Sequence, residues 1–278
     1  MKKNIAVIQS VYRKDNPVWF ECSIVSILKQ DCGFENINYY LCIDGAIGKE
    51  LKIVVEKYKD KFYKIVSNDP NIGLAASLNK LINSLEYEVY IFRMDSDDIS
   101  CSERFRKQIE YLENNPDVGI CGTSLVEMYD NYGKPKRRDY FENHEKIIKN
   151  MYKGTAAAHP TVCYKRDALN KLKGYDEDNK QNEDIEMWFR AAVLGIKFHN
   201  IREPLYHQMI TKDFYSRRSV LKAFKEFSIY WDGCNRLYGF SWRNFFPLLR
   251  LLSRLIPRWA IKFLYESNFR NYLFKTKP

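Results

Sequence analysis

Residues 89–98 read VYIFRMDSDD, a buried-strand pattern that runs directly into three aspartates within four positions. Residues 89–92 are all β-branched or aromatic, which is typical of a strand. Carboxylates clustered in this way repel one another and cost stability unless a cation lies among them. Mn²⁺ and Mg²⁺ prefer oxygen ligands from carboxylates and substrate phosphates. The stretch therefore predicts a site for a divalent metal at the end of a strand.

The acidic run has a second interpretation. Asp98 or Ser100 is placed to cap the N-terminus of a helix expected over residues 103–112. A cap explains one aspartate, whereas a metal site explains all three. Both interpretations stay open at this point.

The chain before this run alternates between strand and helix patterns. Such alternation predicts an α/β fold, with a parallel sheet covered by helices on both faces. Ligands bind beyond the carboxyl ends of the strands in sheets of this kind. Asp44, Asp95 and the loop 67–73 fall at such ends. The strands are expected at residues 5–11, 39–43, 64–67 and 89–92, and the helices at 17–30, 49–58 and 74–85.

Beyond residue 116 the pattern loosens. A strand is expected over residues 118–126, and a helix over 185–194 that Gly195 closes. Glu183 and Asp184 stand at the start of this helix. The helix dipole favours carboxylates there, and a carboxylate is also a candidate general base. Spacing alone favours the dipole interpretation.

The formal charge of +10 is confined to the last quarter of the chain. Residues 212–278 hold 14 basic and 4 acidic residues, whereas residues 1–211 hold 31 of each. A localised basic tail indicates an anionic partner, either a membrane surface or nucleic acid. No stretch is apolar for long enough to span a bilayer, and residues 1–14 lack a signal-peptide core, so a cytoplasmic location is expected. The seven scattered cysteines indicate reduced thiols.

The tail also carries a helical pattern. Arg250, Arg254, Arg258 and Lys262 recur at every fourth residue, and the leucines of residues 248–255 occupy the other side. With aromatic residues nearby, this is typical of a helix that lies on an anionic membrane. The alternative is an ordinary surface helix that packs its leucines onto the rest of the protein. Nucleic acid is not expected as a partner, because no recognised binding motif accompanies the charge.

Several short motifs occur along the chain in a fixed order. They are Ser10-Val11-Tyr12, Asp44-Gly45, Asn71-Ile72-Gly73-Leu74-Ala75 with Leu78-Asn79, Met94-Asp95-Ser96-Asp97-Asp98 with Arg104-Phe105 and Gln108, His159-Pro160-Thr161, and Glu183-Asp184 with Met187-Trp188. Together they resemble glycosyltransferase family 2, the inverting enzymes with the GT-A fold, over about residues 4–210.

The resemblance implies the GT-A fold, a Rossmann-like, mostly parallel sheet covered by helices. It implies a catalytic domain over residues 1–211, with a nucleotide-binding half (1–100) and an acceptor-binding half (101–211). The change of composition near residue 211 adds a basic, amphipathic helical extension over residues 212–278.

The resemblance also implies roles for single residues. Asp184 becomes the general base, and Glu183 the neighbour that orients the acceptor or tunes the base. Asp95, Asp97 and His207 are the implied ligands of Mn²⁺ or Mg²⁺, although a lone histidine is more often structural. His159 is expected to be packed or to lie on the acceptor side. The residues implied to bind the nucleotide sugar are Ser10, Tyr12, Asp44, Asn71, Asp95 and Ser96.

The implied reaction is transfer of a hexose, galactose or glucose, from a UDP-sugar to a lipid-linked acceptor. Related bacterial enzymes of O-antigen and exopolysaccharide synthesis use GlcNAc-diphosphate-undecaprenol and form a β linkage, commonly β1,3. The enzyme is then expected at the inner face of the inner membrane. Two alternatives are a non-catalytic module that binds sugar nucleotides or membranes, and a nucleotidyltransferase. The latter usually has a glycine-rich phosphate loop near its N-terminus, and residues 9–16 contain no glycine.

Overall fold

The computed structural model describes residues 4–129, 134–179, 182–210 and 220–255. Strands and helices alternate through the first hundred residues, as predicted. This part comprises β1 (Ile5–Tyr12), α1 (Pro17–Leu28), β2 (Ile37–Asp44), α2 (Lys49–Lys57), β3 (Lys64–Asn68), α3 (Leu74–Ile82), β4 (Tyr90–Met94) and β5 (Ile99–Ser100). It is followed by α4 (Arg104–Asn114), β6 (Val118–Tyr129), β7 (Lys136–Arg138), α5 (His144–Asn150), β8 (Cys163–Lys165), α6 (Arg166–Leu172), α7 (Glu183–Val193), β9 (Lys197–Ile210), α8 (Val220–Tyr238) and α9 (Phe245–Leu255).

The strands join one sheet in the order β3-β2-β1-β4-β8-β6-β9-β5, with β7 paired to β6. Strands β1 to β4 are parallel, so their carboxyl ends share one edge. Strand β8 is antiparallel to β4, and β6 and β9 run parallel to each other. The predicted α/β class is confirmed, and the second half of the sheet mixes strand directions.

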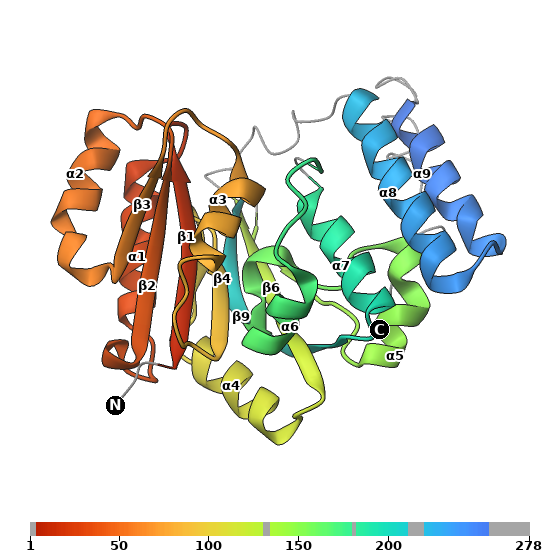
Figure 1. Cartoon of the computed structure of the whole chain (residues 1–278), viewed down its shortest axis with the longest axis horizontal. Helices are drawn as coiled ribbons and strands as arrows, with labels where there is room; N and C mark the ends of the chain where they lie inside the picture. The colour runs from red at the N-terminus through yellow and green to blue at the C-terminus, as the bar shows by residue number, and fades with distance from the viewer. Residues whose placement is uncertain (1–3, 130–133, 180–181, 211–219, 256–278) are drawn as a thin grey trace.

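Helices cover both faces of the sheet (Figure 1). One face packs against α1, α2 and α4, and the other packs against α3, α6 and α7. Side chains alternate along β4, so Ile91 belongs to the second face, and Phe92 and Met94 to the first. Arg93 and Asp95 therefore point towards the face that α3, α6 and α7 cover.

The helices α8 and α9 form an outer layer at the end of the molecule farthest from α2 (Figure 1). Helix α8 packs on α7, and α9 packs on α8. Gly233 permits the close approach, because a Cβ there would lie 2.3 Å from the ring of Phe189 on α7. No helix among the described residues is both long and apolar enough to cross a membrane. The seven cysteines are free thiols, as the sequence indicated.

Helix α9 engages one of its predicted basic residues with α8. Arg250 Nε is 3.0 Å from Glu226 Oε1 on α8, and its guanidinium lies over the ring of Tyr230, although 38% of the side chain stays exposed. Glu226 is buried, and a buried carboxylate needs a paired charge. The side chain of Arg254, and Arg258 and Lys262 as a whole, lie outside the described part of the chain.

Asn79 joins the two halves of the molecule. Its Nδ2 donates to the carbonyl of Tyr175 at 2.9 Å, and its Oδ1 accepts from the amide of Tyr175 at 2.8 Å. A third bond joins Nδ2 to Glu177 Oε1 at 2.8 Å. One side chain on α3 thus holds the segment that leads to α7.

Asn79→Ala should lower the free energy of unfolding by about 1–3 kcal/mol, because it leaves the backbone groups of Tyr175 without their partner. Denaturant titration of the full chain measures this. Asn83→Ala is the matched control, because Asn83 is exposed at the end of the same helix. Equal losses of stability in the two variants would contradict the proposed link.

Candidate active site

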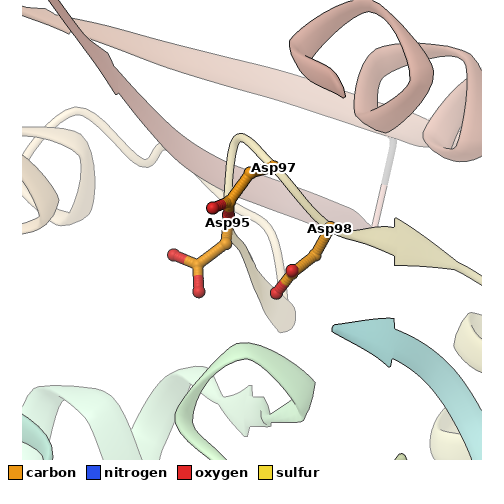
Figure 2. Close-up of side chains that lie close together, drawn as sticks. All are labelled: Asp95, Asp97 and Asp98. Carbon is orange, nitrogen blue, oxygen red and sulfur yellow. The ribbon is translucent and has the colours of Figure 1, made fainter. Parts of the chain in front are cut away.

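Three carboxylates project to the same side from the turn that follows β4 (Figure 2). They belong to Asp95, Asp97 and Asp98, and one oxygen of each lies within 4.8 Å of the others. The strand β4 places this turn at the edge where β1 and β2 also end. The structure thus brings together the acidic run that the sequence singled out.

The turn is anchored from three other elements. The carbonyl of Asp95 accepts hydrogen bonds from Gln9 Nε2 at 2.8 Å and Ser23 Oγ at 3.0 Å. Its amide donates to Tyr206 Oη at 3.3 Å. Strand β1, helix α1 and strand β9 therefore fix the position from which the carboxylates project.

Asp98 serves neither as a helix cap nor as a solvated charge. It is buried, its Oδ1 accepts from the amide of Met209 at 2.8 Å, and its Oδ2 has no hydrogen-bond partner among the residues that the structure describes. Helix α4 starts at Arg104 with Glu103 at the N-cap and no side-chain capping bond. The capping interpretation of Asp98 and Ser100 is therefore wrong.

The electrostatics of the cluster favour either protonation or a bound cation. Burial, together with Asp95 and Asp15, raises the pKa of Asp97 to about 7. Burial also raises the pKa of Asp98, and the charges of Asp95 and Asp97 add to this shift. Three carboxylates close together, with one Asp98 oxygen that has no partner among the described residues, fit a hard divalent cation such as Mn²⁺ or Mg²⁺.

His207 does not belong to this cluster. His207 lies opposite Ile99 in the pairing of β5 with β9, so the two side chains share one face of the sheet. Because successive side chains point to opposite faces, the neighbouring Asp98 is directed to the other face. Its Nε2 lies 3.9 Å from Cys101 Sγ. The predicted role of His207 as a metal ligand gains no support from this geometry.

Asp44 shapes the loop that follows β3. Its Oδ1 accepts from Asn68 Nδ2 and from the amide of Ile72, both at 2.9 Å. Its Oδ2 accepts from Asn71 Nδ2 at 2.7 Å and from the amide of Gly73 at 2.9 Å. These four bonds occupy the acceptor sites of the carboxylate. The predicted contacts of Asp44 and Asn71 with a nucleotide stay predictions.

The first strand ends beside the acidic turn. Ser10 and Tyr12 are half-buried at the end of β1, and the amide of Tyr12 donates to Asp15 Oδ2 at 3.0 Å. Ser96 Oγ donates to the same oxygen at 2.7 Å. Asp15 was not among the expected site residues, although its place just after β1 puts it at the sheet edge where Asp95 lies.

Asp184 and Glu183 occupy the first turn of α7, as predicted. Glu183 is buried, and the side chain of Asp184 is half-buried. Burial raises the pKa of Asp184, and the opposing effects come from the Ile185 amide, Arg93 and Lys222. A carboxylate with a raised pKa is suited to accept a proton.

A chain of buried polar groups lies beneath α7. His159 Nε2 is 2.8 Å from Tyr175 Oη, which is 3.0 Å from Tyr164 Oη. Tyr164 Oη in turn donates to Met187 Sδ on α7 at 3.5 Å. His159 is thus a packed residue, one of the two positions expected for it, and burial lowers its pKa well below the ordinary value.

Arg93 is the second residue that the sequence analysis missed. It is buried on β4, and its Nη2 is paired with Asp95 Oδ1. A charged residue inside an otherwise apolar strand pattern was the available signal, because such a charge is expensive to bury without a partner.

Comparison with known proteins identifies the family. The family model for glycosyl transferase family 2 matches residues 10–173. The putative glycosyltransferase EpsE of Bacillus subtilis is 31% identical over 84% of this chain and 82% of its own length. An Escherichia coli protein, the UDP-Gal:alpha-D-GlcNAc-diphosphoundecaprenol beta-1,3-galactosyltransferase, is 25% identical over 97% of this chain and 94% of its own length.

A solved structure shares the fold. The mannosyltransferase PcManGT of Pyrobaculum calidifontis, in complex with GDP-Man and Mn²⁺, matches with a TM-score of 0.60 and 13% identity. The match covers 98% of this chain and 81% of that one. It agrees with the GT-A architecture that the motifs imply. The family model covers the end of β1, the strands β2 to β4 and the acidic turn, and the chain belongs to glycosyltransferase family 2.

Proposed function

We propose that this protein is an inverting glycosyltransferase that moves a hexose, galactose or glucose, from a UDP-sugar to a lipid-linked saccharide. The product carries a β linkage, and the reaction serves the synthesis of a bacterial surface polysaccharide. One observation carries the proposal: a carboxylate cluster that fits a divalent cation lies at the sheet edge, on the face that the Asp184 helix covers.

The donor is proposed to bind at the acidic turn. Asp95 and Asp97 are the carboxylates that would hold Mn²⁺ or Mg²⁺, and Asp98 is the third member of the cluster. When bound, such a cation neutralises the diphosphate and the charge that develops on the leaving group. The Mn²⁺ in the mannosyltransferase structure supports this assignment.

The chemical step is proposed to use Asp184. Inversion needs a single displacement, in which the acceptor oxygen bonds to the anomeric carbon as the bond from that carbon to the UDP oxygen breaks. The hydroxyl proton moves to a carboxylate oxygen of Asp184. The raised pKa of Asp184 favours this transfer, because a more basic carboxylate holds the proton better.

The acceptor is proposed to be GlcNAc-diphosphate-undecaprenol or a close analogue, joined through a β1,3 linkage. Support comes from the name of the Escherichia coli relative, which aligns over almost the whole of both chains. An acceptor of this kind is confined to the membrane, so the enzyme must work at the membrane surface, which we place at the inner face of the inner membrane.

The outward face of α9, with the turn before it, is the proposed contact with the anionic membrane. Both acidic residues of α8 are already paired with arginines, Glu226 with Arg250 and Asp232 with Arg236. Because these two carboxylates are already paired, the basic excess of residues 212–278 remains available to anionic headgroups. The apolar side chains exposed on this face are Phe240, Trp242, Phe245, Leu248, Leu249 and Leu252.

The metal site predicts a pH dependence. A protonated Asp97 cannot bind a cation, and its pKa without one is about 7. Affinity for Mn²⁺ should therefore rise as the pH rises from about 6 to about 8 and then level off. Calorimetric titration of UDP with Mn²⁺ present measures this. Asp97→Ala should bind UDP more weakly and lose the pH dependence, and Asp60→Ala, at a remote exposed site, should keep both. If the UDP affinity of Asp97→Ala changed with pH as much as that of the unmodified chain does, the role of Asp97 would be rejected.

Asp184→Asn should bind UDP and Mn²⁺ like the unmodified chain and lose transfer by about 100-fold or more, because no base remains. The assay measures UDP release from UDP-galactose and UDP-glucose with a GlcNAc-diphosphate-lipid mimic. Glu186→Gln is the control on the same helix, since Glu186 pairs with Arg190. Turnover retained in Asp184→Asn would exclude Asp184 as the base.

The membrane contact is tested with the double variant Phe245→Glu and Leu249→Glu. Binding to phosphatidylglycerol vesicles should weaken about tenfold or more, because two exposed apolar side chains can no longer enter the interface. Cosedimentation measures the binding. Ile53→Glu is the control, because Ile53 is equally exposed on the distant helix α2. Equal binding by the double variant and the unmodified chain would disprove the assignment.

A further inference from the structure

Arg93 is a buried cation with unused hydrogen-bonding capacity. Its side chain is 3% exposed, and its Nη2 is paired with Asp95 Oδ1. Its Nε and Nη1 have no hydrogen-bond partner among the described residues. Burying a guanidinium costs several kcal/mol even when it is paired, so a single ion pair does not explain its position through stability.

The surroundings of Arg93 connect it with both carboxylate sites. It projects from β4 to the face that α7 covers, where the pair His159 and Tyr175 lies. Its charge lowers the pKa of both His159 and Asp184. Arg93 therefore contacts a member of the acidic cluster directly and lies on the sheet face against which the Asp184 helix packs.

Other charged groups near Asp184 do not replace Arg93. Lys222 on α8 also favours the ionised form of Asp184, and Glu183 adjoins it on α7. Among the described residues, four tyrosines also respond to the charge of Asp184: Tyr140, Tyr164, Tyr175 and Tyr230. Of the two cations, Arg93 is the buried one that also holds Asp95.

We propose that Arg93 is a positioning residue shared by the two carboxylate sites: its guanidinium orients Asp95 in the acidic cluster and supplies a buried positive charge on the sheet face that the Asp184 helix covers. The inference rests on the proposed function. It adds a link between the donor and acceptor sides, because one side chain supports the groups that act on each.

The test compares Arg93→Met, which removes the charge, with Arg93→Lys, which keeps it without the planar fork. Mn²⁺ affinity is measured by electron paramagnetic resonance with UDP present. The pH profile of kcat/KM is measured at Mn²⁺ concentrations that saturate each variant. Arg166→Lys is the control, because Arg166 also pairs with a buried carboxylate, Glu88, but does so beside the amino end of β4, away from the acidic turn.

Arg93→Met should weaken Mn²⁺ binding roughly 10- to 100-fold, as loss of a group that orients a metal ligand does. It should also move the acidic limb of the pH profile up by about one unit, because the ionised base loses an opposite charge. Arg93→Lys should return the acidic limb of the pH profile to its wild-type position and leave Mn²⁺ binding weakened. Arg166→Lys should change neither measurement.

Wild-type Mn²⁺ affinity together with an unshifted limb in Arg93→Met would overturn the proposal. If Arg93→Met does not fold, Arg93→Lys decides, and wild-type Mn²⁺ affinity in that variant has the same meaning. A lack of Mn²⁺ binding or of transfer in the unmodified chain would reject the proposed function instead, so the two failures are distinguishable.

Discussion

Three carboxylates on one turn cannot all be ionised at close range without positive charge among them, and the rest of the site is arranged around this constraint. The oxygens of Asp95, Asp97 and Asp98 lie within 4.8 Å of one another. Inside the protein, the guanidinium of Arg93 pairs with Asp95, and the amide of Met209 donates to one oxygen of Asp98. We propose that a divalent cation supplies the remaining positive charge, and its natural further ligands are the oxygens of a diphosphate. A donor that carries a diphosphate thus completes the electrostatics of the turn.

The fold places the two reacting sides on one support. Parallel strands end at a common edge, where ligands bind in sheets of this kind, and β4 delivers the acidic turn there. The proposed base Asp184 lies on α7, which packs on the same sheet face to which Arg93 and Asp95 point. Asn79 ties the segment before α7 to helix α3. Helices α8 and α9 extend this layer outward, so the proposed membrane contact lies two helices away from Asp184.

Much of this arrangement could be predicted from the sequence, because its signals are local. Strands β1 to β4 follow from apolar runs, and the start of α1 follows from the Asn16-Pro17 pair, whose cap bonds the structure contains. What could not be predicted depends on partners far along the chain. The amide that binds Asp98 belongs to a residue 111 positions later. The helical period of α9 could not show that Arg250 pairs with Glu226, since this depends on a buried residue of another helix. For the same reason, the strand pattern gave no sign that Arg93 pairs with Asp95 on the face that α7 covers.

The central claim is that a divalent cation binds at the acidic turn. Crystals grown with UDP and Mn²⁺, with diffraction data collected at the manganese absorption edge, locate the metal directly. We expect one anomalous peak between the carboxylates of Asp95 and Asp97 and the diphosphate of UDP. UDP bound at the sheet edge with no manganese among the three carboxylates, or manganese bound elsewhere, would contradict it.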